Sequence, residues 1–216
     1  MITISDIALI LQELSDERPL YHSEADFQHA LAWRIHQRFS DARVRLEVNP
    51  YKDGQRAYLD ILLHFGDVPV AIELKYKTRK MDFSYGNEDF HLLDQSAQDT
   101  GRYDFIKDVC RLERFVTANP DALGIAVFLS NDPSYWTAGK RDDTVDGQFR
   151  IHESNILKGT FRWGELASAG TRRGRDIELE LSNEYPLIWQ DYSVVNDSKS
   201  GQFKYLLLDI HKPVVS

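Results

Sequence analysis

The feature that most constrains the fold of this chain is a pair of apolar segments joined by one short turn. The segments "AYLDILLHF" and "VPVAIELKY" have the length and the share of β-branched and apolar residues that favour strands. Gly66 and Asp67 lie between them, and both residue types suit a two-residue turn. The sequence therefore predicts an antiparallel β-hairpin with a buried face.

The turn also predicts which residues of the hairpin lie opposite one another. With Gly66 and Asp67 in the turn, Asp60 comes opposite Glu73, and Lys75 lies on the same face as Glu73 because side chains alternate along a strand. Cross-strand neighbours have Cβ atoms roughly 5 Å apart, so the two carboxylates are expected to converge beside the lysine. The other face is apolar and is expected in the core: Leu59, Ile61, Leu63, Phe65, Val70, Ile72 and Leu74.

The segments around the hairpin predict an α/β fold. Ser23 is a suitable N-cap for a helix that runs to about Phe39, and "RVRLEV" then has the pattern of a strand. Residues 81–94 have no regular pattern, helical spacing returns from about Gln95 to Asn119, and "LGIAVFLS" has the composition of a buried strand. This order predicts an αβββαβ core, in which helices flank a mixed central sheet.

The whole chain, residues 1–216, is expected to form a single domain, because no linker, repeat or low-complexity tract divides it. From about residue 145 the pattern changes to short strand-like pieces separated by Gly-rich or charged turns. Residues 145–216 are therefore expected to form a β-rich extension of the same domain. The pattern leaves open whether this extension joins the central sheet or forms a smaller one.

The predicted hairpin has two carboxylates, which repel each other, and one ammonium group, which attracts them, on the same face. Like charges a few ångströms apart in a partly dry site require that one carboxyl takes up a proton or that a cation lies between them. Carboxylate oxygens select Mg²⁺ or Mn²⁺, and such an ion polarises a phosphoryl oxygen and lowers the pKa of a bound water. Asp60, Glu73 and Lys75 therefore predict a metal-dependent site for phosphodiester hydrolysis. A solvated hairpin with a cross-strand ion pair is the alternative.

The spacing of these residues resembles a known nuclease signature. Asp60, twelve intervening residues and then Glu73-Leu74-Lys75 are similar to the motif of the PD-(D/E)XK nuclease superfamily, which has a restriction-endonuclease-like fold with an αβββαβ core. The resemblance covers about residues 20–132. It implies that Asp60 and Glu73 bind Mg²⁺ or Mn²⁺, that the Leu74 main-chain carbonyl is a further ligand, and that Lys75 assists the attacking water.

Further positions can be compared with the superfamily. Leu59 stands where the proline of the family name is usual, and Glu24 stands where many members have an active-site glutamate on the first helix. An acidic residue in a first helical turn is also favourable without any catalytic role, because of the helix dipole. Some branches have Gln and Tyr on the helix after the lysine strand, which Gln98 and Tyr103 resemble at a spacing one residue longer. Arg102 shares a helix face with Gln98, and these three residues either contact phosphates or anchor the helix.

Two basic clusters are further candidates for phosphate contacts. Because the net charge of the chain is −8, any nucleic acid must be held by such local clusters rather than by a general positive field. A solvated loop is the alternative for each cluster. The first cluster is Lys77, Arg79 and Lys80, and the second is Arg172, Arg173 and Arg175.

The remaining features favour a cytoplasmic protein. Cys110 is the single cysteine, so no intrachain disulfide forms, and no apolar run has the roughly 20 residues that span a bilayer. The sequence therefore predicts a nuclease that depends on Mg²⁺ or Mn²⁺ and acts as a DNA endonuclease. It predicts no membrane partner, and a homodimer is the assembly that we consider. The alternative is a noncatalytic nucleic-acid-binding or protein-binding module on a nuclease-like scaffold.

Overall fold

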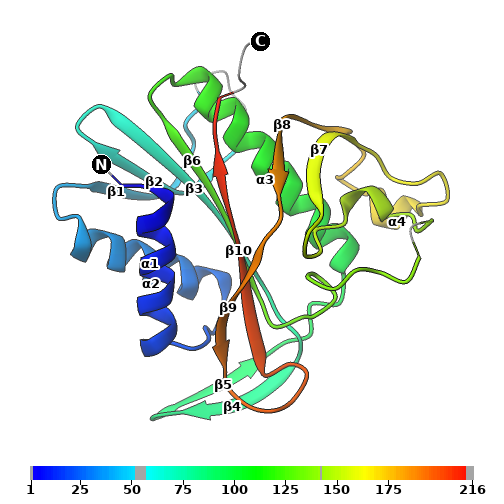
Figure 1. Cartoon of the computed structure of the whole chain (residues 1–216), viewed down its shortest axis with the longest axis horizontal. Coiled ribbons are helices and arrows are strands. Elements are labelled where there is room, and N and C mark those ends of the chain that lie inside the picture. The colour runs from blue at the N-terminus through cyan, green and yellow to red at the C-terminus, as the bar shows by residue number, and fades with distance from the viewer. Residues whose placement is uncertain (1, 52–56, 142, 213–216) are drawn as a thin grey trace.

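The computed structural model describes residues 2–51, 57–141 and 143–212 as a mixed α/β fold (Figure 1). In these residues no helix is both long enough and apolar enough to cross a membrane. The helices are α1 (Ile4–Glu17), α2 (Glu24–Arg38), α3 (Gln98–Ala118) and the short α4 (Ala169–Arg172). The strands are β1 (Arg43–Val48), β2 (Leu59–Phe65), β3 (Val68–Lys77), β4 (Met81–Tyr85), β5 (Glu88–Leu92), β6 (Leu123–Ser130), β7 (Ile156–Phe161), β8 (Leu179–Pro186), β9 (Trp189–Val194) and β10 (Gln202–Ile210).

The central sheet contains six of the described strands, in the order β1-β2-β3-β6-β10-β9. β3 and β6 are parallel, and the other neighbouring pairs are antiparallel, so the sheet is mixed as predicted. α1 and α2 cover one face of this sheet, and α3 covers the other (Figure 1). β4 with β5, and β7 with β8, form two separate two-stranded sheets.

Each face of the central sheet has its own hydrophobic core. On the side of α1 and α2, residues such as Leu31 and Ile72 are completely buried. On the side of α3, Ile106 and Phe128 are completely buried. Burying one large apolar side chain contributes about 1.5–3 kcal/mol, so the two cores hold β2 and β3 firmly from both sides.

The β2–β3 hairpin has the register that its turn predicts. The ladder runs from the Phe65–Val68 pair to the Ile61–Ile72 pair, around a turn in which Gly66 has a φ of +62°. Glycine adopts this left-handed conformation without the steric cost that a Cβ atom brings. The predicted register is confirmed, and the ladder ends just before the predicted acidic pair.

One residue of the predicted apolar face lies on the opposite side of the sheet. Leu59 packs in the core beneath α3, whereas Ile61 and Leu63 pack in the core beneath α1 and α2. Regular alternation predicts the same face for all three, so this part of the prediction is wrong. The β1–β2 ladder is interrupted at Glu47, which has a φ of +53°, and β2 changes face beside this irregular residue.

The start of α2 is fixed by hydrogen bonds that the sequence predicts. Ser23 Oγ accepts a hydrogen bond from the N–H of Asp26 at 3.1 Å, which satisfies one free N–H of the first turn. The Asp26 carboxylate accepts from the N–H of His22 at 3.0 Å and pairs with Arg18. These contacts set the position of Glu24 in the first turn of α2.

The segment 81–94 is more regular than predicted. β4 and β5 form a hairpin around Gly86, with Phe83 opposite Phe90. Phe90 is 2% exposed and stacks on His22 with ring centroids 4.3 Å apart. The expectation of an irregular segment is therefore wrong: apolar and polar residues alternate in "MDFSY", and Gly86 suits the turn, but each strand has only five residues and the pattern is correspondingly short.

The segment predicted to be rich in strands contains β7, β8, β9 and β10. Part of it extends the central sheet, because β10 pairs with β6 from Lys204–Ser130 to Ile210–Gly124, and β9 pairs with β10. Another part, β7 with β8, forms a separate pair that packs against α3. Both of the arrangements that the sequence leaves open therefore occur.

Candidate active site

The candidate site lies where β2 and β3 stop pairing. Beyond the Ile61–Ile72 pair, β3 keeps its parallel partner β6 as far as Lys77, but it has no paired residue of β2 on its other edge. A buried N–H group needs an acceptor. The N–H of Leu74 finds one in the side chain of Asp60, since it donates to Oδ2 at 2.6 Å.

Glu24 provides a second such acceptor further along β3. Its Oε2 accepts a hydrogen bond from the N–H of Tyr76 at 2.8 Å, which ties the first turn of α2 to the strand. Leu74 and Tyr76 are the two neighbours of Lys75 in the chain, so Asp60 and Glu24 hold the strand on both sides of the lysine. The structure therefore brings these three predicted residues together.

A buried glutamine holds the backbone at Asp60. Gln28 is 6% exposed, and its Nε2 donates to the main-chain oxygen of Asp60 at 2.7 Å and to Oε1 of Glu47 at 2.8 Å. It thus stabilises the irregular stretch where β2 changes face. Gln28 was not among the predicted residues. It could have been recognised as a polar side chain next to Phe27 in the apolar stripe of α2.

Glu73 and Lys75 are each paired with a charged residue of α3. Arg111 Nη1 lies 2.7 Å from Glu73 Oε1, and Lys75 Nζ lies 2.6 Å from Asp108 Oδ2. Arg111 Nη2 also contacts Asp108 Oδ1, so Glu73, Arg111, Asp108 and Lys75 form one continuous ion network. The side chains of Glu73 and Asp108 are only 2% and 5% exposed. The network is therefore enclosed between β3 and α3.

The ion network changes the interpretation of the acidic pair. The sequence requires a proton or a cation near the carboxylates, and the structure supplies cations from the protein itself, Arg111 for Glu73 and Lys75 for Asp108. Removing one partner of a buried ion pair costs about 3–5 kcal/mol. Each of these charges therefore depends on its partner within the network.

Burial shifts the proton affinity of both hairpin carboxyl groups. It raises the pKa of Asp60 to about 6, although Lys75 and the N–H of Leu74 act in the opposite direction. Burial also raises the pKa of Glu73 well above its usual range, and the ion pair with Arg111 opposes this shift. Carboxyl groups with raised pKa values are frequent at functional sites, since such sites combine burial with nearby like charges.

Lys75 keeps its positive charge at neutral pH. Burial alone lowers its pKa, but the carboxylates of Asp108 and Glu24 outweigh burial and raise the pKa above the ordinary lysine value. A protonated ammonium group donates hydrogen bonds and stabilises negative charge, and it does not accept a proton. Lys75 is therefore suited to orient a water molecule or to stabilise developing charge.

Asp108 and Arg111 are functional candidates that the sequence analysis missed. Asp108 follows Phe105 by three residues and precedes Leu112 by four, so it lies on the apolar stripe of α3. A charged residue on a buried stripe is rare unless it is paired. That position is the signal from which the ion network could have been predicted.

The donor set suits a hard divalent cation in its chemistry. Asp60 and Glu73 offer carboxylate oxygens and Leu74 a main-chain carbonyl, which are the ligand types that Mg²⁺ and Mn²⁺ prefer. In the described part of the chain, however, no three Asp, Glu, His or Cys residues surround a common metal position. The Leu74 carbonyl accepts from Lys75 Nζ at 3.0 Å, and Glu73 pairs with Arg111. Glu73 and the Leu74 carbonyl thus contact cations of the protein, whereas Asp60 accepts the N–H of Leu74.

The three candidate residues at the start of α3 are engaged inside the protein. Arg102 is 3% exposed and donates to Asp146 Oδ2 at 2.7 Å, and Tyr103 is 1% exposed and donates to a main-chain carbonyl. Gln98 donates to Asp132 Oδ2 at 2.8 Å. These contacts agree with the anchoring alternative. Contact of Arg102 and Tyr103 with phosphate is not supported, because this face of α3 is covered by other parts of the chain.

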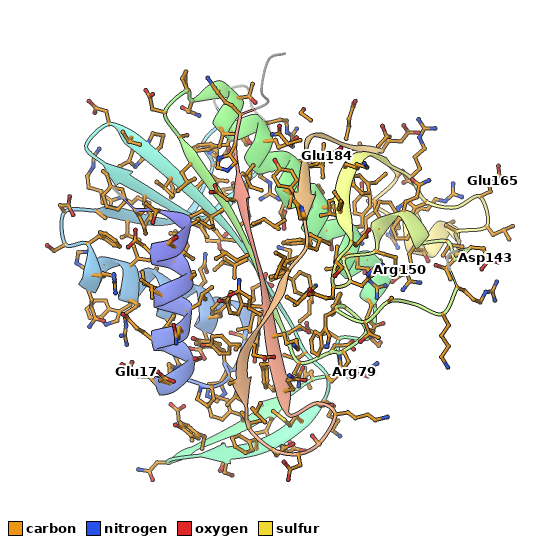
Figure 2. The ribbon with its side chains drawn as sticks, viewed as in Figure 1. Glu17, Arg79, Asp143, Arg150, Glu165 and Glu184 are labelled. Atoms are coloured by element: carbon orange, nitrogen blue, oxygen red, sulfur yellow. The ribbon has the colours of Figure 1, made fainter. Side chains whose placement is uncertain are left out.

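The first basic cluster continues the strand that carries Lys75. Lys77 is half-buried, Lys80 is exposed, and Arg79 Nε lies 3.2 Å from Asp132 Oδ1. Arg79 follows the end of β3 and precedes the β4–β5 hairpin, and Figure 2 shows it on that side of the molecule. This cluster therefore directly follows the residues of the candidate site in the sequence.

The second basic cluster begins at the last residue of α4 and is partly used in internal contacts. Arg175 forms a bidentate pair with Asp104, with distances of 2.9 and 2.7 Å. Arg172 donates to the main-chain oxygen of Glu165 at 3.0 Å, and Arg173 is exposed. Figure 2 shows Glu165 at the outer margin of this region. Of these three arginines, Arg173 is the most accessible to a partner.

No known protein family, curated protein or solved structure that was compared with the chain matches it. A function for this protein therefore has to be argued from the geometry and chemistry of its own residues.

Proposed function

We propose that this protein hydrolyses phosphodiester bonds of DNA in a reaction that depends on Mg²⁺ or Mn²⁺. The order α2, β1, β2, β3, α3 and β6, with the β4–β5 hairpin inserted between β3 and α3, agrees with a restriction-endonuclease-like core and supports membership of the PD-(D/E)XK superfamily. The single cysteine, Cys110, agrees with action in a reducing, cytoplasmic compartment. A homodimer stays a prediction.

The observation that carries the proposal is the pair of carboxylates that replace a strand partner beside Lys75. Asp60 and Glu24 accept the N–H groups of Leu74 and Tyr76, so three chemically active side chains are fixed around one stretch of β3. Strands that are covered on both faces hold such groups rigidly, which catalysis requires. An ordinary solvated hairpin does not need this arrangement.

The residues have distinct roles in the proposed reaction. Asp60, Glu73 and the Leu74 carbonyl would hold the divalent cation, whose contribution when bound is to polarise a phosphoryl oxygen. Lys75 donates hydrogen bonds to the attacking water or to the oxygens on which negative charge develops. Asp108 is a positioning residue, since it holds the ammonium group of Lys75. Lys77 and Lys80 lie further along the chain to contact the phosphates of the substrate.

The ion network favours a second candidate, a noncatalytic binding module on the same scaffold. Glu73, Lys75, Asp108 and Arg111 compensate one another without any added ion. A network of this kind also occurs in proteins where it has only a structural role. The two candidates therefore differ in whether the site binds a metal ion and cleaves DNA.

The test is cleavage of supercoiled plasmid and of single-stranded DNA with Mn²⁺. We expect the wild type to cleave and Lys75→Ala to lose about 100-fold or more in rate, because a charge-stabilising donor is removed. Lys107→Ala is the control, since Lys107 is an exposed lysine on α3 beside Asp108. It is expected to cleave like the wild type.

The outcomes of this test bear on the role of Lys75 and on the choice between the two candidates. Equal cleavage by the wild type and Lys75→Ala would refute the role of the lysine. No cleavage by the wild type, together with no binding of Mn²⁺, would favour the noncatalytic module.

A further inference from the structure

We infer that Arg111 is an internal counter-ion that a divalent cation must displace from Glu73, so that α3 sets the metal affinity of the site. The inference rests on the proposed function, because it assigns a role to α3 in the same site. It concerns a residue that the nuclease signature of the sequence does not contain.

The contacts of Arg111 place its guanidinium on the carboxylate that the metal needs. Nη1 lies 2.7 Å from Glu73 Oε1 and donates to the main-chain oxygen of Tyr58 at 2.6 Å, while Nη2 contacts Asp108. Glu73 is 2% exposed, so solvent does not screen this pair. A dication bound to Glu73 would meet the charge of Arg111 at close range and be repelled by it.

The geometry offers Arg111 a way to leave Glu73 without losing all its partners. Its second nitrogen is held by Asp108, which also holds Lys75. Arg111 can therefore keep its pair with Asp108 while its first nitrogen turns away from Glu73. Lys75 has no ion pair with Glu73 or Asp60 among the described contacts, so Arg111 is the competing cation.

The formal charges of the site agree with an exchange of this kind. When all four carboxyl groups are ionised, Glu24, Asp60, Glu73 and Asp108 lie around two cations, Lys75 and Arg111, which leaves a formal charge of −2. One divalent cation balances this excess. The protein without metal retains some repulsion, which Arg111 reduces until an ion binds.

The inference is tested by the affinity for Mn²⁺, measured by electron paramagnetic resonance and calorimetry without any nucleic acid. We expect Arg111→Gln to bind Mn²⁺ about ten-fold or more tightly than the wild type, because changes next to metal ligands alter affinity on this scale. Arg114→Gln is the matched control, since Arg114 is an exposed arginine one turn further along α3. Screening by solvent should limit its effect to less than about two-fold.

A second variant keeps the test valid if Arg111→Gln does not fold. Arg111→Lys retains the charge but has a shorter reach and a single nitrogen, so it should hold Glu73 less well and bind Mn²⁺ with an affinity between the other two. Saturating Mn²⁺ should also raise the melting temperature of both variants more than that of the wild type.

The outcomes separate this inference from the proposed function. DNA cleavage by the wild type, with the same Mn²⁺ affinity in the wild type and both Arg111 variants, would overturn the inference alone. Mn²⁺ binding by the Arg111 variants but not by the wild type would support the inference and count against metal-dependent cleavage. Absence of Mn²⁺ binding in all of these proteins would overturn both.

Discussion

The carboxyl group of Asp60 is subject to two opposing influences. Burial favours its protonated form, while Lys75 and the N–H of Leu74 favour the charged form, and burial wins because the pKa rises to about 6. A carboxyl group whose pKa is higher in the folded than in the unfolded chain binds its proton more tightly when folded. It therefore stabilises the fold at low pH, and this contribution is lost as the pH rises from about 4 through about 6.

This behaviour predicts that Asp60→Asn gains stability relative to the wild type as the pH rises. The difference in free energy of unfolding between the two proteins should change by up to about 3 kcal/mol between acidic and neutral pH. Urea unfolding at pH 4 and pH 7 in the presence of EDTA measures it. The asparagine can still accept the N–H of Leu74, so parallel pH profiles for the two proteins would contradict the assignment.

A second prediction for a single residue concerns Arg102, which is buried and paired with Asp146. Arg102→Ala should lower the free energy of unfolding by about 3 kcal/mol, at the lower end for a buried pair, because Arg150 still lies 3.3 Å from Asp146. Arg141→Ala is the control, since that arginine is 72% exposed. Its pair with Asp143 is open to solvent and should contribute little to stability. Equal losses in urea unfolding would argue against burial as the cause.

At the scale of single elements, the helix α3 packs closely on the segment that follows β6. A Cβ atom added at Gly101 would lie 2.5 Å from Oη of Tyr135, a side chain that is 1% exposed. That hydroxyl has no hydrogen-bond partner among the described residues. The glycine is therefore required by the close approach of the tyrosine to the helix backbone.

Gly101→Ala should consequently destabilise the protein by about 1–3 kcal/mol, as overpacking of a core does. Tyr135→Phe removes the clashing oxygen, and the next atom of the ring is 3.5 Å away, so the double variant should recover most of the loss. Tyr135→Phe alone should change stability by less than about 1 kcal/mol. Thermal unfolding of the three variants checks this, and an uncorrected loss in the double variant would contradict it.

The elements also show which parts of the fold and site can be predicted from sequence. The β2–β3 register follows from Gly66 and the period of two, because both signals are local. The β4–β5 hairpin was missed because each of its strands has only five residues, so the alternation of apolar and polar side chains covers a short stretch. Asp108 and Arg111 were not predicted because only the apolar spacing of α3 was considered, and not the charged residues that lie between those apolar positions. The pairing of Glu73 with α3 depends on packing between distant segments, which no local pattern contains.

On the scale of the whole molecule, the last strand is an inner member of the central sheet. β10 lies between β6 and β9, and it contributes buried residues such as Phe203 and Leu206 to the two cores. The sequence predicted strands in this segment but not their place, since a strand pattern does not identify its partner. The segment after residue 132 is therefore needed to shield β6 and to complete the two hydrophobic cores of residues 20–132.

A chain that ends at residue 200 should lose cooperative unfolding altogether. It lacks β10, so β6 becomes an edge strand, β9 has no partner, and both cores lose buried side chains. Calorimetry and near-ultraviolet circular dichroism measure the loss. A truncated chain with a sharp transition near that of the full chain would show that β10 contributes little.

The place of β10 has a consequence for how a cell makes this protein. β10 is synthesised after every other strand of the sheet and yet lies inside it, so the sheet cannot be completed until this segment has left the ribosome. Until then the nascent chain exposes the edge of β6 and needs protection from aggregation. A product of interrupted translation that lacks β10 would therefore lack the completed central sheet that carries β3 and its candidate site.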